Sequence, residues 1–244
     1  MLEVKELRKH FGPFEAVKGV SFTADKGEVL GFLGPNGAGK PTTMRMITGF
    51  LPPTSGTATV NGHDILTDSV AAKGQIGYLP ENAPAYGSMS VTGFLTFAAD
   101  IRGFRGSEKK DRVEAAIMKC HLDKVRQQSI HTLSKGFRQR TCFAQSILHD
   151  PPILIMDEPT DGLDPNQKFT VREMIKQMAA EKTIIVSTHI LEEVDAVCTR
   201  AIIISSGQIV FNGTPAELRG QSPSGRLDDV FRMLTVAKEE KGNG

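Results

Sequence analysis

The sequence predicts an α/β fold with a helical insertion, and three patterns support this prediction. Short apolar runs alternate with stretches of helical spacing in the first 80 residues and again after residue 150. From about residue 88 to residue 150 the periodic stretches are helical. Asn61-Gly62 and Ser206-Gly207 each separate two strand-like runs, which predicts hairpins. We therefore expect an α/β core, antiparallel strands beside it and a helical insertion at about residues 82–150.

The first 80 residues predict strands around one short helix. Val29 to Leu33 is an unbroken apolar run, as expected of a buried strand, and it leads into a glycine-rich turn. Residues 1–30 and 54–79 are expected to supply antiparallel strands on the flank of the core. After the turn, helical spacing predicts a helix that Gly49 and Pro52 close, with Met44, Ile47 and Phe50 on one face.

The helical insertion includes one clearly amphipathic stretch. Ser107 is the residue that we expect to cap its N-terminus, because a serine oxygen can accept the free amides of a first turn. The apolar face has members three or four residues apart, namely Val113, Ala116, Ile117 and Cys120.

After residue 150 strands and helices alternate again. Ile153 to Met156 and Thr183 to Val186 are predicted buried strands, and Ile190 to Cys198 is amphipathic. Asp164 is expected to cap a helix that begins at Pro165. The buried side of that helix is expected to consist of Phe169, Met174, Ile175 and Met178.

The composition excludes several function classes. The net charge is +1, from 29 Lys and Arg against 28 Asp and Glu, so we expect no nucleic-acid partner. The three cysteines are far apart and form no CxxC pair, which argues against zinc and redox motifs. No run approaches the roughly 20 apolar residues of a membrane helix, and the charged N-terminus has no signal-like stretch. Membrane association is therefore expected only through a partner.

One glycine-rich turn carries the chemistry of phosphate binding. The pattern G-x-x-x-x-G-K lets backbone amides face the phosphates, adds the positive end of the following helix, and places a lysine at the β- and γ-phosphates. Here it is formed by Gly34, Pro35, Asn36, Gly37, Ala38, Gly39 and Lys40.

The next position departs from this pattern. Ser or Thr usually supplies a hydroxyl to Mg²⁺ there, but this chain has Pro41, which lacks both a hydroxyl and an N–H. Proline also disfavours a helical conformation at Lys40, although a first helical turn tolerates it. Thr42 and Thr43 are nearby hydroxyls, but one step along a helix rotates a side chain by about 100°. Whether Thr42 replaces the missing ligand stays open at this point.

A second motif complements the first. The apolar strand Ile153 to Met156 ends in Asp157 and Glu158, which is the Walker B arrangement. Asp157 is expected to hold Mg²⁺, directly or through water, and Glu158 to act as general base toward the attacking water.

With these motifs the chain resembles the ABC ATPase family, over about residues 2–218. Leu133-Ser134-Lys135-Gly136-Phe137 is similar to the family signature LSGGQ, with Lys135 and Phe137 as departures. Asp161-Gly162-Leu163-Asp164 resembles the D-loop, usually SGLD. The resemblance implies that Ser134 and Gly136 of one subunit close over the γ-phosphate held by the other.

The resemblance assigns three more residues. His189 matches the switch histidine, which contacts the γ-phosphate and orients the attacking water. Glu81 stands where the Q-loop usually has glutamine, and its oxygen could serve Mg²⁺ or a bound water. Phe11 resembles the aromatic residue that stacks on adenine, although a partly buried phenylalanine at a strand end is the simpler alternative.

The family implies a fold and a function. The fold is a P-loop NTPase with a RecA-like core, an antiparallel β subdomain and an inserted helical signature subdomain, at residues 1–220, followed by a partly loose tail at 221–244. The function is ATP hydrolysis with Mg²⁺ that drives integral membrane permease subunits. Glu81-Asn82-Ala83-Pro84 and the LSKGF form are most similar to ATPase subunits of gliding-motility, copper-processing and multidrug-type exporters. We expect a cytoplasmic protein held at the inner face of the cell membrane by its permease.

Other functions remain open on the sequence alone. Two such subunits are expected to enclose two ATP molecules, and the second subunit is either an identical copy or a paralogue. Pro41 raises the alternative of a slow or non-catalytic nucleotide switch. A soluble ABC ATPase of translation or DNA repair is a third candidate, but the chain has a single cassette and no sustained heptads or basic patch. The transported substrate and the direction of transport cannot be read from these residues.

Overall fold

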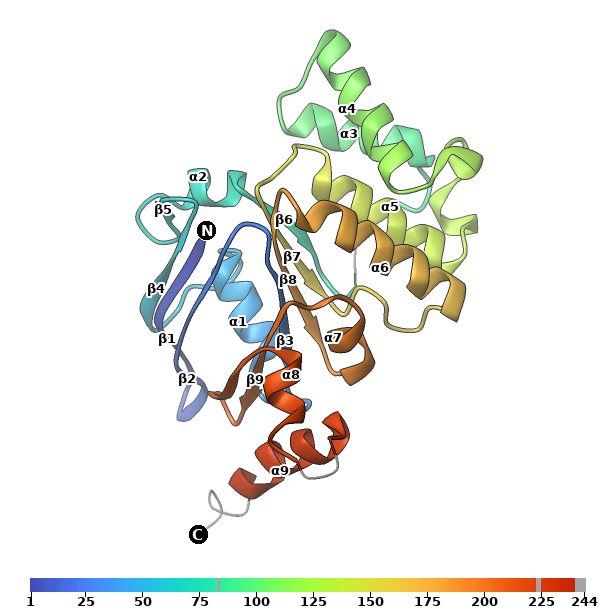
Figure 1. The fold of residues 1–244 in the computed structure, drawn as a ribbon. Helices are drawn as coiled ribbons and strands as arrows, with labels where there is room; N and C mark the ends of the chain where they lie inside the picture. Colours follow the sequence, from blue (N-terminus) through green and yellow to red (C-terminus); the bar gives the residue numbers. More distant parts are fainter. Residues whose placement is uncertain (83, 223–224, 240–244) are drawn as a thin grey trace.

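A computed structural model describes residues 1–82, 84–222 and 225–239, and shows two β-sheets with helices around them (Figure 1). The antiparallel sheet has the strand order β2-β1-β4-β5. Asn61 and Gly62, with φ of 48° and 87°, make the turn from β4 to β5, which confirms the predicted hairpin. The strands are β1 (Leu2–Phe11), β2 (Phe14–Ala24), β4 (Ser55–Val60) and β5 (His63–Asp64).

The second sheet has six strands in the order β10-β9-β3-β8-β7-β6. All neighbours are parallel except β10, which forms the predicted hairpin with β9. Its central strands are buried along their whole length, as expected for a parallel sheet covered on both faces. The strands are β3 (Val29–Leu33), β6 (Ile76–Leu79), β7 (Ile153–Asp157), β8 (Thr183–Thr188), β9 (Arg200–Ser205) and β10 (Gln208–Gly213).

Residues 54–79 only partly follow the prediction of antiparallel strands. A short helix, α2 (Ser69–Gly74), interrupts them, and β6 pairs in parallel with β7. The reason is a close fit that sequence patterns do not reveal. A Cβ at Gly77 of β6 would lie 2.3 Å from the carbonyl oxygen of Ser146, so this strand accommodates the backbone of a helix from the insertion.

Figure 1 shows how the main helices lie around the two sheets. Helix α1 (Lys40–Ile47) lies between the two sheets and packs its buried side chains against both. Helices α6 (Pro165–Ala179) and α7 (Leu191–Val197) follow β7 and β8. The insertion consists of α3 (Val91–Ile101), α4 (Gly106–Lys119), α5 (Lys135–Ile147) and the 3₁₀ turns η1 (Asp123–Val125) and η2 (Ile130–Thr132).

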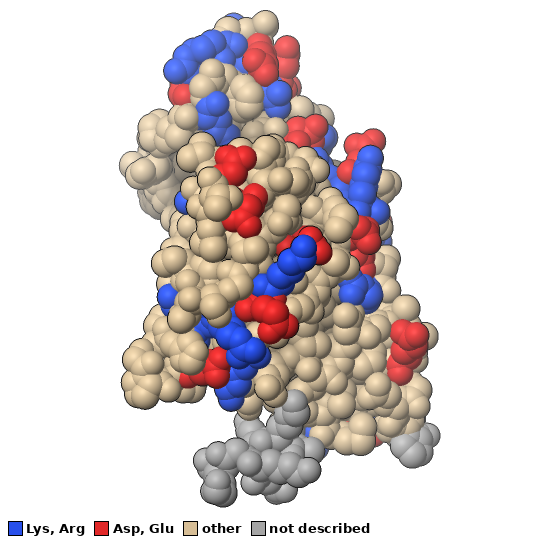
Figure 2. Space-filling model, turned by 90° about the vertical axis from the view of Figure 1, so that its left-hand side faces the viewer, with Lys and Arg blue, Asp and Glu red and all other residues tan. Residues whose placement is uncertain are grey.

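The surface carries charges of both signs. On the face drawn in Figure 2, basic and acidic side chains lie together in small mixed groups. Broad uncharged areas separate these groups from one another. Across residues 1–82, 84–222 and 225–239, no helix combines the length and the hydrophobicity that crossing a membrane requires.

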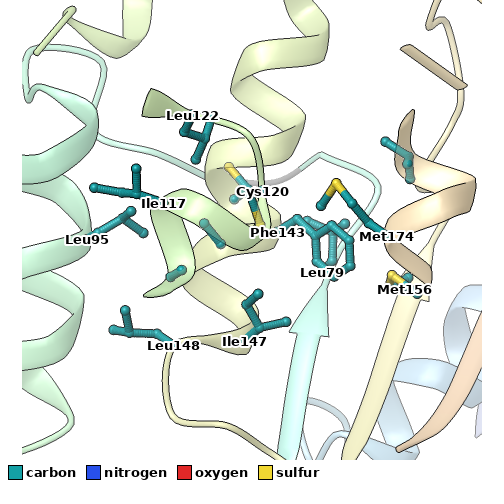
Figure 3. Packing of buried hydrophobic residues seen from close by; sticks show 14 of the residues in the cluster. Leu79, Leu95, Ile117, Cys120, Leu122, Phe143, Ile147, Leu148, Met156 and Met174 are labelled. Atoms are coloured by element: carbon teal, nitrogen blue, oxygen red, sulfur yellow. The ribbon is translucent and has the colours of Figure 1, made fainter. Parts of the chain in front are cut away.

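One apolar cluster ties the insertion to the core (Figure 3). Phe143 of α5 is 1% exposed and belongs to the same cluster as Leu79 at the end of β6 and Met174 of α6. Leu95 of α3 and Ile117 of α4 continue this cluster into the insertion, and both are fully buried. Interiors that are packed this closely transmit strain. A movement of the insertion should therefore displace the residues at the end of β6.

Two phenylalanines that were predicted to lie on buried helix faces are exposed instead. Phe50 is 72% exposed, because α1 ends at Ile47 and Gly49, at φ of 70°, turns the chain away. Phe169 is 64% exposed. The buried stripe of α6 contains Val171, Met174 and Ile175, three or four residues apart, and Phe169 does not fall on it.

The predicted cap of α4 is also wrong. The helix begins at Gly106, with Arg105 at the N-cap and no side-chain cap, so Ser107 lies inside the first turn. By contrast, Asp164 caps α6 as predicted, accepting a hydrogen bond of 3.0 Å from the amide of Gln167.

The segment after Gly220 is more ordered than the sequence predicts. Helix α8 (Pro215–Arg219) precedes it, and helix α9 (Leu227–Glu239) follows. Leu227 and Val230 of α9 are buried in a cluster with residues of β9 and β10. Residues 223–224 and 240–244 of the expected tail, and Ala83 of the insertion, lie outside the described residues. The division at residue 220 stays a prediction.

His149 lies between α5 and β7, beside the start of β6. Its Nε2 is 3.1 Å from the carbonyl oxygen of Ile76, and Nε2 carries the proton because a carbonyl can only accept. Burial lowers the pKa of His149 to about 4, and the positive charge of Arg102 acts in the same direction. The folded protein therefore holds this side chain neutral.

His149 should cost the fold stability in acid. Its folded pKa of about 4 lies below the ordinary 6.5, so between these values the unfolded chain binds a proton that the folded chain does not. The stability that depends on a neutral His149 is fully present above pH 6.5 and is lost as the pH falls from 6.5 to 4. The free energy of unfolding should fall by on the order of 2 kcal/mol more than in His149→Gln, with allowance for partial exposure. Urea unfolding across this window checks this, and parallel curves for the two proteins would contradict it.

Candidate nucleotide-binding site

The parallel register brings the motif residues to one edge of the six-stranded sheet. Leu33, the last residue of β3, pairs with Thr188 at the end of β8. Asp157, the last residue of β7, pairs with Ser187 of β8. The glycine-rich turn, the acidic pair and His189 all follow these strand ends, so three segments distant in sequence open at the same place. Such an edge is where open parallel sheets place their ligands.

The glycine-rich turn has no room for side chains at its two ends. A Cβ at Gly34 would lie 2.3 Å from the carbonyl oxygen of Ile204, and one at Gly39 would lie 2.7 Å from that of Ala16. Gly39 also has a φ of 104°, which favours glycine, and it is the N-cap of α1. Residues 34–39 are thus a backbone cradle at the N-terminus of a helix, as the motif predicts.

Lys40 is buried inside this cradle. Its Nζ donates hydrogen bonds to the carbonyl oxygens of Gly34, at 2.6 Å, and Pro35, at 3.2 Å. Only 4% of the residue is exposed, and burial lowers the pKa of its ammonium. The negative charges of Glu158, Asp157 and Glu81 oppose that shift. One buried cation therefore faces three carboxylates, which predicts a site for a phosphate and a metal ion.

Pro41 fits the helix but changes its first turn. It follows Lys40 in α1, where a missing N–H costs nothing because first-turn amides have no partner within the helix. Contrary to the expected effect of proline, Lys40 is helical, and the amide of Thr43 bonds the carbonyl oxygen of Gly39 at 2.9 Å. The hydroxyl of Thr43 donates to the same oxygen at 2.9 Å. Thr42, which is partly exposed, is therefore the hydroxyl of this turn left for a metal.

The acidic residues form a donor set that suits Mg²⁺. Burial raises the pKa of Asp157, and the charges of Glu158 and Glu81 add to the rise. A divalent cation would relieve this repulsion. Within the described residues, no three His, Cys, Asp or Glu side chains could hold a metal by themselves. Asp157 and Glu81 thus fit an ion that takes further ligands from phosphate and water, as Mg²⁺ does.

Glu158 has the geometry of a general base. It adopts a φ of 50°, unusual for a non-glycine residue, and its amide bonds the carbonyl oxygen of Ser187 at 2.9 Å. Its Oε1 lies 2.9 Å from Nδ1 of His189, and Oε2 is buried without a hydrogen-bond partner in the described structure. A buried carboxylate oxygen rarely lacks a partner, so Oε2 is suited to accept a proton from water.

Ser134 and Gly136 lie elsewhere. Ser134 caps α5, its Oγ accepting from the amide of Phe137 at 3.4 Å. A Cβ at Gly136 would lie 2.4 Å from the side chain of Gln167 of α6. Gly136 is thus packed onto the start of α6, whereas Ser134 is exposed.

Phe11 is at the tip of the β1–β2 hairpin. It is 50% exposed, and the ammonium of Lys9 lies 5.4 Å from the centre of its ring. Phe14, its partner across the hairpin, is 63% exposed. The predicted aromatic surface is therefore available, and it has a second ring that sequence patterns did not single out.

Two other residues near the metal site were not predicted. Burial raises the pKa of Tyr78 to about 12, and the charge of Asp157 adds to the rise. The Ser187 side chain opposes the rise in the pKa of Asp157, although its buried hydroxyl has no hydrogen-bond partner among the described residues. Tyr78 precedes Glu81 by three residues, so its place beside the Q-loop position was a signal that could have been used.

Comparisons with known proteins identify the family of this chain. A family model described as "ABC transporter" matches residues 17–161. The chain is 36% identical over 240 residues to "Probable multidrug ABC transporter ATP-binding protein YbhF" of Escherichia coli (strain K12), an alignment that covers 96% of this chain and 41% of that protein. It is also 36% identical over 238 residues to "Linearmycin resistance ATP-binding protein LnrL" of Bacillus subtilis (strain 168), covering 97% of this chain and 75% of that protein.

A solved structure extends the agreement to the fold. "Structure of ATP binding subunit of ABC transporter" superposes with a TM-score of 0.85 at 29% identity, covering 96% of this chain and 99% of that chain. The α/β fold of a P-loop NTPase is therefore confirmed. This chain spans 41% of the length of YbhF and 75% of that of LnrL.

Removal of the Lys40 charge should weaken nucleotide binding. In Lys40→Met the cradle loses its buried cation, and charge-assisted hydrogen bonds are worth about 1.5–3 kcal/mol. The dissociation constant of a fluorescent ATP analogue should therefore rise by about 10- to 100-fold. Lys124→Met, at an exposed lysine of η1, is the matched control and should bind as the parent does. Equal affinity in all three proteins would show that Lys40 does not contact the nucleotide.

Proposed function

This chain belongs to the ABC transporter family, and from that premise we propose that it is the ATP-binding and ATP-hydrolysing subunit of an ABC transporter. The observation that carries the proposal is the convergence of one buried cation, a metal-binding carboxylate and a base at one sheet edge. Lys40, Asp157 and Glu158 belong to two segments over 100 residues apart, and only the parallel register joins them.

Each residue has a distinct role in this proposal. Residues 34–39 and Lys40 bind the phosphates of ATP, and Phe11 stacks on the adenine. Mg²⁺, when bound, neutralises charge on the phosphates, and Asp157, Glu81 and Thr42 would hold it. Glu158 accepts the proton of the attacking water through Oε2. His189 orients Glu158 through its 2.9 Å contact and faces the γ-phosphate.

The signature segment is proposed to serve a second subunit. Ser134 is exposed at the N-cap of the 13-residue helix α5, and the first amides of a helix have no partner within it. A second ATPase subunit, either identical or a paralogue, would place its nucleotide there. ATP then closes the dimer and hydrolysis releases it.

The permease partner is proposed to dock beside Glu81. Two cavities of about 580 and 690 Å³ meet there and share Pro84, Arg102 and Gln145. Exposed apolar side chains line them, with Tyr86 at 57%, Ile101 at 70% and Phe50 at 72%. An apolar groove between the core and the insertion suits an amphipathic helix of a membrane protein. Its contact with Pro80, Asn82 and Pro84 would link docking to the proposed metal site.

Export is the direction that the relatives favour. The printed names of YbhF and LnrL refer to multidrug transport and to linearmycin resistance. We propose that this subunit works in an exporter, at the inner face of the membrane, and without a nucleic-acid partner. The mixed charges of Figure 2 are in keeping with that last point.

A slow nucleotide switch is the second candidate, and Pro41 favours it. With the Thr43 hydroxyl committed to Gly39, the first turn of α1 offers Mg²⁺ only Thr42, from a rotated position. The intact pair of Glu158 and His189 favours hydrolysis.

Hydrolysis should depend on Glu158. The Glu158→Gln variant keeps the shape of the side chain but removes its basicity, so Mg²⁺-dependent release of phosphate should fall by about 100-fold or more while ATP still binds. Steady-state phosphate release with matched nucleotide titration checks this. If the parent binds ATP but neither protein hydrolyses it, the switch is the better description.

Pro41→Ser should restore the missing hydroxyl. We expect the Mg²⁺ concentration for half-maximal ATPase activity to fall about 3- to 10-fold, because one neutral metal ligand is added. Pro41→Ala, which restores the N–H but not the hydroxyl, is the control. If Pro41→Ser and Pro41→Ala behave alike, the hydroxyl is not what the site lacks.

A further inference from the structure

Two departures from the family motifs contact each other in this fold. Lys135 replaces a glycine of the signature and Asp161 replaces a serine of the D-loop. They are 26 residues apart in sequence, yet Nζ of Lys135 lies 3.3 Å from Oδ2 of Asp161. Their side chains are 53% and 48% exposed. The glycine and serine of the family pattern could not form this ion pair, so the two departures are complementary.

The packing around this pair is close. A Cβ at Gly162, which has a φ of 62°, would lie 2.1 Å from Nζ of Lys135 and 3.2 Å from its Cε. The Lys135 side chain therefore lies directly on the D-loop backbone. Beside it, Gly136 leaves room for the side chain of Gln167. Two adjacent contacts thus hold the first turn of α5 against residues 161–167.

Asp161 also belongs to the backbone turn that begins at Glu158, the proposed general base. Its amide donates to the carbonyl oxygen of Glu158 at 3.2 Å, and Glu158 has the unusual φ of 50°. Oε1 of Glu158 is 2.9 Å from Nδ1 of His189. A displacement of Asp161 therefore acts on the backbone conformation that aims the Glu158 carboxylate.

We propose that Lys135 and Asp161 are a positioning pair that couples the signature segment to the base Glu158 of the same chain. This inference rests on the proposed function, in which Ser134 and Gly136, on either side of Lys135, face the nucleotide of a second subunit. When Ser134 and Gly136 contact the nucleotide of the second subunit, the first turn of α5 is fixed. The ion pair then passes that constraint to Glu158, the base at the nucleotide site of its own chain. Neither residue touches the reacting atoms.

A double-mutant cycle tests the pair. Lys135→Gly and Asp161→Ser each restore the usual family residue, and we expect each to lower kcat about two- to fivefold with KM for ATP within about twofold, the range of an exposed ion pair. The double variant should be no slower than either single variant. The exchange Lys135→Asp with Asp161→Lys, and the conservative Lys135→Arg, should recover kcat to within about twofold of the parent.

A second ion pair provides the control. Lys176 and Glu173 of α6 are 3.2 Å apart and 50% and 41% exposed, close to the values of the proposed pair. Lys176→Gln and Glu173→Gln should leave kcat and KM unchanged. Thermal unfolding of every variant should stay within a few degrees of the parent, which separates positioning from loss of fold.

The outcomes separate this inference from the proposed function. Additive effects in the double variant, or an exchanged pair as slow as the single variants, would overturn the coupling while the parent still hydrolyses ATP. A parent that binds no ATP would overturn both. A fall in kcat at unchanged KM, with recovery in the exchanged pair, supports the pair as proposed.

Discussion

Lys40 and Asp157 are held in a part of the molecule that water scarcely reaches, and the rest of the site depends on that arrangement. Burial lowers the pKa of Lys40 and raises that of Asp157, so each charge is destabilised by its surroundings and relieved by the other. Triphosphate and a divalent cation would complete this balance. The fold maintains it through three fully buried parallel strands that end at one edge.

Close backbone packing makes this site rigid. Gly34 and Gly39 let the cradle approach Ile204 and Ala16 so closely that a methyl group would collide with a carbonyl oxygen. The four-stranded sheet, the six-stranded sheet and α1 therefore act as one unit around the phosphates. The insertion is joined differently, through the apolar cluster at Phe143 and through the contacts at the start of α5.

Departures from the family motifs occur at Pro41, Glu81, Lys135 and Asp161. Pro41 lacks the hydroxyl that the family pattern has at the proposed metal site, while Glu81 brings a negative charge that acts on Asp157. Lys135 and Asp161 bring opposite charges to two segments that are ordinarily uncharged at these positions. Lys135 and Asp161 are 26 residues apart in sequence and meet only in the fold.

The sequence by itself determined the elements that local chemistry controls. The strands before Gly34 and Asp157, the two hairpins and the Asp164 cap follow from side-chain spacing, turn sterics and hydrogen bonds within a few residues. The motifs named nearly every member of the candidate site for the same reason, since phosphate and metal chemistry restrict the residue types at short spacings.

Only the tertiary structure decided the features that depend on which distant segments meet. Examples are the parallel pairing of β6, the exposure of Phe50 and Phe169, and the packing of α9 on β9. Another is the hydrogen bond that the Thr43 hydroxyl donates to the carbonyl oxygen of Gly39. The contact between Lys135 and Asp161 belongs to this group as well. Local patterns report the preferences of a residue for its neighbours along the chain. Contacts across 26 residues or more depend on strand order and helix packing, which no short window contains.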